Sequence, residues 1–173
     1  MYVSAVMKDA ALADFDKARG EWESALAEVP DEALRYLKPG DDYALGGLQV
    51  HVNGVLVHYR RVLDGLIAGG FAPIGPLDPV GENDEVNAKA KAGLTGDGRI
   101  KALAEMAALH KAVLAAARGL PEASWSRKAP VVYGAGQDPY PTSAEEIIGW
   151  LSDHYREHVQ QCPELVAAWR EAG

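Results

Sequence analysis

Apolar residues recur at intervals of three and four positions in four long stretches of the chain, at about residues 4–27, 43–66, 99–118 and 143–162. This spacing places them along one side of a helix and predicts four long amphipathic helices. The second stretch contains several β-branched residues, which would also suit a strand. Its length and its 3.6-residue period favour a helix.

Residues that begin or end helices lie at the boundaries of these stretches. Pro30 follows the first stretch, and Gly69 closes the second. Residues 142–145 (TSAE) match a capping box, in which a hydroxyl and a carboxylate pair with the first free N–H groups of a helix. Pro163 is expected to end the fourth helix and to open a last short helix that runs through Trp169.

Two long connections separate the helices. Residues 71–98 are rich in proline and glycine, with a short helix expected over residues 83–92. Residues 122–141 read as irregular, with an extended piece at 131–133, and no strand pair is predicted. Connections of this length inside a compact domain are more often functional, or crossovers between helices, than idle.

The fold class follows from this order of elements. The sequence predicts an all-α fold, a four-helix bundle that forms a single domain over residues 1–173, with long connections after the second and third helices. A chain of this length buries a real core. Metal sites in such bundles are built from side chains of facing helices.

Composition and charge exclude several classes of partner. The formal net charge is -8, and the basic residues are scattered. Nucleic acid and anionic membrane surfaces both need a positive footprint, so neither partner is expected. No apolar run is long enough to span a bilayer, and no signal-peptide pattern is recognised. Cys162 is the only cysteine, which favours a reducing, cytoplasmic compartment.

The candidate chemistry lies in the histidines, of which there are five. His154 and His158 are four residues apart in the fourth helix, so their side chains lie on one face, with Cβ atoms roughly 6 Å apart. Both imidazoles can then reach one metal ion, because zinc–nitrogen bonds are about 2.0–2.1 Å long. The pair also shares a stripe with apolar neighbours, so two polar residues at the edge of a core are the alternative interpretation.

A third ligand has to come from another helix. His51 lies on the apolar side of the second helix and is the preferred candidate. His58 lies two turns further along and cannot serve the same ion unless the helix tilts steeply, so it is expected to be a satisfied or surface histidine. His110, in the third helix, is expected to be structural.

The histidine pair also fits another metal motif. Residues 154–158 (HYREH) match H-x-x-E-H, the inverted zinc-peptidase pattern. That motif needs a third ligand well downstream. Only fifteen residues follow His158, and Glu164 and Glu171 are the only acids among them. The peptidase interpretation is therefore disfavoured.

The order of these features resembles the DinB-like superfamily, which includes the YfiT-type proteins, over nearly the whole chain. Residues 48–52 (LQVHV) resemble the family segment that carries a single metal histidine in the second helix. Residues 84–88 (DEVNA) resemble a D-x-x-N segment ahead of the third helix. Residues 143–148 (SAEEII), followed by 154–158, resemble the final helix with its H-x-x-x-H pair.

This resemblance implies a class of function and not one reaction. It carries the family's metal triad over to His51, His154 and His158, and it implies a divalent ion, zinc or nickel, with open positions for water or substrate. It also implies a homodimer. Members include thiol-dependent transferases that use bacillithiol or mycothiol, a maleylpyruvate isomerase and hydrolase-like resistance proteins. The leading hypothesis is a metal-dependent enzyme that acts on a small molecule, either a thiol S-transferase with a low-molecular-weight thiol cosubstrate or a hydrolase.

Other side chains near the pair have two interpretations each. Glu157 is the candidate catalytic base or a partner that orients a ligand, although a solvent-facing helix acid is the plainer interpretation, and Asp153 is a similar candidate. Tyr155 either lines the site or packs in the core. Cys162 is either a soft extra ligand or a small buried hydrophobe.

Two classes other than an enzyme stay open. The first is a non-catalytic bundle, in which the histidines are structural or hold a stabilising ion and function lies in dimer contacts or ligand sequestration. The second is a small-molecule binding protein whose pocket is capped by residues 71–98.

Overall fold

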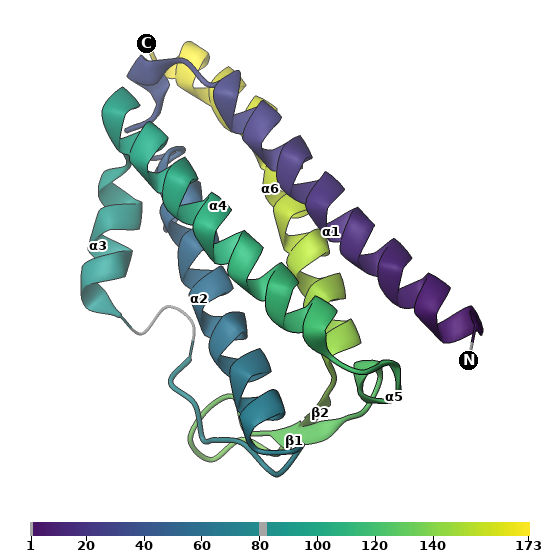
Figure 1. The fold of residues 1–173 in the computed structure, drawn as a ribbon. Coiled ribbons are helices and arrows are strands. Elements are labelled where there is room, and N and C mark those ends of the chain that lie inside the picture. Colours follow the sequence, from purple (N-terminus) through teal and green to yellow (C-terminus); the bar gives the residue numbers. More distant parts are fainter. Residues whose placement is uncertain (1, 80–82) are drawn as a thin grey trace.

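The structure, a computed structural model, describes residues 2–79 and 83–173, and it consists of long helices with a short hairpin at one end (Figure 1). This confirms the all-α class. The bundle is built by four long helices: α1 (Tyr2–Ala27), α2 (Gly47–Ala68), α4 (Gly96–Gly119) and α6 (Ala144–Ala172). Shorter elements connect them: η1 (Asp31–Ala33), α3 (Asp84–Ala92), α5 (Glu122–Trp125), β1 (Ala129–Val131) and β2 (Tyr140–Thr142).

The four long helices pack mainly as two pairs. α1 lies along α6, and α2 lies along α4, while α2 makes a smaller contact with α6 (Figure 1). The side chains between them are fully buried and come from every long helix, among them Phe15, Trp22, Leu63, Met106 and Ile147. Each such side chain contributes about 1.5–3 kcal/mol to folding through burial. The predicted apolar faces therefore form one shared core.

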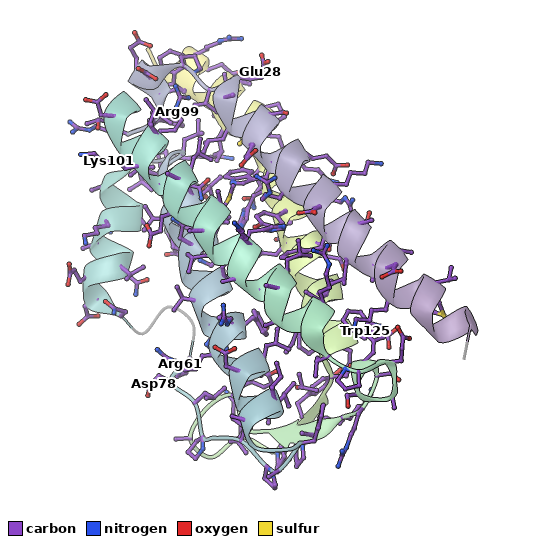
Figure 2. All side chains as sticks on the ribbon, in the orientation of Figure 1. Glu28, Arg61, Asp78, Arg99, Lys101 and Trp125 are labelled. Carbon is purple, nitrogen blue, oxygen red and sulfur yellow. The ribbon has the colours of Figure 1, made fainter. Side chains whose placement is uncertain are left out.

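Arg99 joins the beginning of α4 to the end of α1 (Figure 2). Its guanidinium donates hydrogen bonds to the carbonyl oxygens of Leu26 and Val29 at 3.0 and 2.6 Å, and it pairs with Asp31. A cation at the C-terminal end of a helix also interacts favourably with the helix dipole. The end of α1 is therefore held without a glycine cap.

The beginning of α6 differs by one residue from the predicted capping box. Ser143 is the N-cap, its hydroxyl accepts from the N–H of Glu146, and the Glu146 carboxylate accepts from the N–H of Ser143. Thr142 cannot be the cap because it is the last residue of β2 and its hydroxyl contacts Tyr133 and the carbonyl of Tyr140. The motif is thus SAEE.

α6 also continues where the sequence predicted a break. It runs through Pro163 as one helix of 29 residues, so the prediction of a separate short helix after Pro163 is wrong. A proline inside a helix removes one backbone hydrogen bond and costs about 3 kcal/mol. Cys162 and Leu165 on either side of Pro163 are buried in the core, and their packing offsets this cost.

The two long connections meet at one end of the bundle. β1 and β2 pair antiparallel, with Ala129 opposite Thr142, and Ile74 of the other connection bridges to Val131. Sequence patterns missed this hairpin because Pro130 and Pro141 lie opposite each other, and proline normally argues against a strand.

The segment between α1 and α2 is also ordered by backbone contacts. Leu45 N–H donates to the carbonyl of Tyr36, and Ala44 N–H donates to the carbonyl of Ala90 in α3. α2 consequently begins at Gly47 and not near residue 43. A Cβ at Gly47 would lie 1.7 Å from the Ala90 carbonyl oxygen, so only glycine permits this close approach.

Candidate metal centre

His51 of α2 meets His154 and His158 of α6 in the interior of the bundle. The Nε2 atom of His154 lies 3.0 Å from Nε2 of His51 and 3.0 Å from Nε2 of His158. One ligand atom from each ring lies within 4.8 Å of the others. The structure thus brings together the three histidines that the sequence singled out.

Helical geometry explains this meeting. His154 and His158 are one turn apart on α6 and point the same way, as the four-residue spacing predicts. His51 lies on the side of α2 that faces α6, between the buried residues Leu48 and Val55. Facing positions on two packed helices therefore bring nitrogens that are 103 residues apart in the chain to hydrogen-bond distance.

A neighbouring amide fixes the orientation and tautomer of His158. Its Nδ1 lies 2.7 Å from Oε1 of Gln161, three residues along α6. An amide oxygen only accepts, so Nδ1 carries the proton and donates it. In the neutral ring Nε2 then has a free lone pair, and this lone pair is directed toward the other two histidines.

The donor set fits a metal ion. One imidazole nitrogen carries either one N–H or one lone pair, so it makes one well-directed hydrogen bond. Nε2 of His154 nevertheless has two nitrogen neighbours at 3.0 Å. Two nitrogens bonded to one ion at about 2.0–2.1 Å are about 2.9–3.4 Å apart for angles between about 90° and 109°. A shared cation therefore explains the spacing better than hydrogen bonds do.

Burial keeps the three rings neutral. Desolvation, with a smaller effect from His158, lowers the pKa of His51 to about 4. Desolvation and the two other rings lower the pKa of His154 to about 3. Desolvation also lowers the pKa of His158, and Gln161 and the charge of Glu157 oppose this shift. Neutral imidazoles at pH 7 are the form that binds a metal ion.

Aromatic side chains contact two of the rings. Tyr43 stacks on His51, with ring centroids 4.6 Å apart and an interplanar angle of 19°. Trp22 of α1 meets His158 edge-on at 5.9 Å and donates its indole N–H to Gln49. The sequence pattern alone gives these aromatic residues no role at the site.

Gln161 is a further residue of the site, and the sequence holds a clue to it. Residues three apart on a helix are neighbours, so a polar partner for His158 is expected at this position. Tyr43 carries no such clue, because it precedes α2 and belongs to an irregular loop.

A pocket of about 510 Å³ opens onto the three histidines. Its walls come from residues 154–165 of α6, from Leu48 and His51 of α2, and from the loop that contains residues 38–43. None of the described part of residues 71–98 lines this space, whereas Val86, Lys89, Leu94 and Gly98 line a second pocket of about 390 Å³ beside α2. The expectation of a small-molecule pocket capped by this segment therefore stays a prediction.

The remaining candidate side chains differ in their surroundings. Glu157 is exposed and lines the pocket, whereas Asp153 is exposed and is not part of the lining. Tyr155 packs in the core, with its hydroxyl 3.0 Å from Nδ1 of His110. Cys162 is buried outside the histidine group, and burial raises the pKa of its thiol to about 11, so it stays a neutral hydrophobe.

The two other histidines lie away from the metal centre. His110 is buried between Tyr155 and Asp16, with its Nε2 2.8 Å from the Asp16 carboxylate. His58 is half-buried against Tyr59 and Tyr133. The third histidine of the site is therefore upstream of the pair, and not downstream as the peptidase motif requires.

Within the described ranges, no helix has both the length and the apolar character that a bilayer crossing demands. A comparison with curated proteins finds no significant match. A family model for the DinB superfamily matches residues 14–162, which include all three histidines and all four long helices in whole or in part. The chain therefore belongs to the DinB superfamily.

Proposed function

We propose that this protein is a divalent-metal-dependent enzyme that acts on a small molecule at the three-histidine centre. The observation that carries the proposal is the convergence of three neutral imidazole nitrogens at the base of an open pocket. Three protein ligands leave coordination positions free, as in catalytic metal sites. Zinc or nickel suits imidazole ligands.

The residues of the chain have separate tasks in such a reaction. His51, His154 and His158 hold the ion, which when bound supplies a Lewis acid and lowers the pKa of a bound water or thiol. Gln161 keeps Nε2 of His158 unprotonated. Glu157 lines the pocket and is the candidate to accept a proton from the nucleophile.

Two reactions follow from this arrangement. With a low-molecular-weight thiol as cosubstrate, the thiolate attacks an electrophilic substrate and the protein is an S-transferase. With water as nucleophile, it is a hydrolase. A cytoplasmic homodimer belongs to the same proposal.

Metal content tests the proposal directly. The protein is purified without a histidine tag, reconstituted with zinc or nickel, dialysed and analysed by atomic emission. We expect about one ion per chain for the wild type and loss of that ion for His154→Ala. His58→Ala is the matched control, because His58 lies on α2 outside the centre, and it should retain the ion. A wild-type protein that binds no divalent ion under any of these conditions would disprove the proposal.

Activity then separates the two reactions. The metal-loaded protein is incubated with bacillithiol, mycothiol or glutathione and an electrophile, and in parallel with a panel of esters and amides. Turnover that requires a thiol identifies a transferase, and turnover without one identifies a hydrolase. Stoichiometric metal without turnover on either panel favours the non-catalytic bundle.

A further inference from the structure

The pocket that opens onto the histidines is strongly acidic. Four carboxylates line it: Asp41 and Asp42 come from the loop before α2, and Glu157 and Glu164 come from α6. Lys38 is the one basic residue among the described lining residues. The carboxylates come from two segments of the chain, the loop and α6, and both segments line the pocket.

These four carboxylates are not neutralised by the fold. Among the residues that the structure describes, none of the four forms an ion pair or a side-chain hydrogen bond. Arg156 directly precedes Glu157, yet it pairs with Asp14 and Glu21 of α1. Arg156 is therefore already bound elsewhere, and Lys38 is the one lysine or arginine set against the four carboxylates in the described lining, so a net negative charge stays available to a ligand.

Fixed negative charge around a cavity attracts cations and repels anions. Carboxylates form their strongest hydrogen bonds with cationic donors such as ammonium and guanidinium groups. Tyr43 lines the same pocket, and an aromatic ring beside carboxylates also favours an organic cation. An anionic substrate would instead approach the histidines against the field of four unpaired carboxylates.

We propose that the substrate of this pocket is a small organic cation, whose ammonium or guanidinium group lies among Asp41, Asp42, Glu157 and Glu164 while its reacting end meets the histidines. The choice of substrate class rests on the proposed function, because the histidine centre supplies the reacting end. The acidic lining itself does not depend on the metal.

Three thiols of similar size but different charge test the inference: 2-aminoethanethiol, 2-mercaptoethanol and 3-mercaptopropionate. Their dissociation constants for the zinc-loaded protein are measured by titration calorimetry at low and high salt. We expect the cationic thiol to bind at least about tenfold more tightly than the anionic thiol at low salt. This ratio should shrink at high salt, because salt screens exposed charges.

A variant with all four carboxylates neutralised, Asp41→Asn, Asp42→Asn, Glu157→Gln and Glu164→Gln, should lose most of this preference. Comparing the ratio between wild type and variant removes the intrinsic difference in acidity between the thiols.

The matched control neutralises four exposed acids outside the pocket lining, Asp78→Asn, Asp84→Asn, Asp97→Asn and Asp138→Asn. It changes the net charge equally and should keep the preference of the wild type. An equal ratio for wild type and pocket variant overturns the inference and leaves the metal centre intact.

A second measurement needs no metal. Nitroxide probes that carry either an ammonium or a carboxylate group are added to the metal-free protein, and broadening of the amide signals of Glu157 and Gln161 is followed by NMR. The cationic probe should broaden these signals several-fold more than the anionic probe. If the protein binds no metal, the proposed function fails, and this experiment still decides the charge preference. Equal broadening by the two probes overturns the inference.

Discussion

Nδ1 of His158 donates a hydrogen bond of 2.7 Å to Oε1 of Gln161, one turn further along α6. This bond sets the tautomer that presents a lone pair to the metal centre. Removing a hydrogen-bond partner of a metal-binding histidine typically lowers metal affinity about 10–100-fold.

Gln161→Leu should therefore weaken zinc binding by about 10–100-fold while the fold is retained. The affinity is measured by competition with a chromogenic chelator, and the fold is checked by circular dichroism. Gln160→Leu is the control, because Gln160 is exposed and adjacent but lies outside the histidine group and the pocket lining. Equal zinc affinity for the two variants would refute a role for Gln161.

Two helical glycines differ in the space around them, and this difference predicts opposite effects on stability when each is replaced by alanine. Gly47→Ala should lower the free energy of unfolding by about 3 kcal/mol or more, because the new Cβ would lie 1.7 Å from the carbonyl oxygen of Ala90. Gly20→Ala, in the middle of α1, meets no atom within 4 Å and should raise the free energy of unfolding by about 0.5–1 kcal/mol. Urea denaturation measures both, and a Gly47→Ala protein as stable as the wild type would contradict the close contact between α2 and α3.

The metal-free protein should lose stability as the pH falls below 6.5. The pKa values of His51 and His154 are lowered on folding, to about 4 and about 3, chiefly by desolvation. The unfolded chain therefore binds more protons than the folded one between pH 6.5 and about 4, so acid favours unfolding. The loss is at most about 1.4 kcal/mol per pH unit for each ring.

Urea denaturation at pH 7.5, 6 and 5 in the presence of a chelator measures this dependence. A variant with His51→Gln and His154→Gln should show a shallower slope, although His58, His110 and His158, whose pKa values are also lowered, keep part of it. A slope that is the same for wild type and variant would count against the buried, neutral histidines.

Removing the hydroxyl of Tyr155 should change the stability of the protein and leave its metal binding unchanged. Its hydroxyl donates to Nδ1 of His110, whose Nε2–H donates to Asp16. Tyr155→Phe leaves the buried Nδ1 without this donor and should cost about 1–3 kcal/mol of stability. Zinc affinity should stay within about twofold of the wild type, because the hydroxyl bonds to His110 of α4, which lies outside the histidine group. Loss of metal without loss of stability would contradict this assignment.

The sequence predicts the long helices and the three histidines well, because both depend on a regular period. A 3.6-residue repeat determines which face of α6 is buried, and a four-residue spacing brings His154 and His158 together whatever the rest of the chain does. Two turns of helix separate His51 from His58, so a rigid element cannot deliver both to one ion. His51 is preferred because it lies on the apolar side of its helix and nearer the start of that helix.

Features of the fold and of the site that do not follow a periodic sequence pattern are harder to predict. The place of Tyr43 depends on backbone bonds between the loop and α3, which join residues far apart in sequence. The hairpin was hidden by Pro130 and Pro141, and the continuity of α6 through Pro163 depends on tertiary packing that outweighs a local preference. The acidic lining of the pocket combines residues from two such segments.

The position of the histidines between α2 and α6 has a mechanical consequence. These helices belong to different packed pairs and touch less extensively than α1 with α6 or α2 with α4. An ion bound to His51, His154 and His158 joins the two pairs and closes a loop of 103 residues. It acts as a reversible cross-link, comparable to a disulfide that restricts the unfolded chain, and it does so in a protein whose single cysteine cannot form one within the chain.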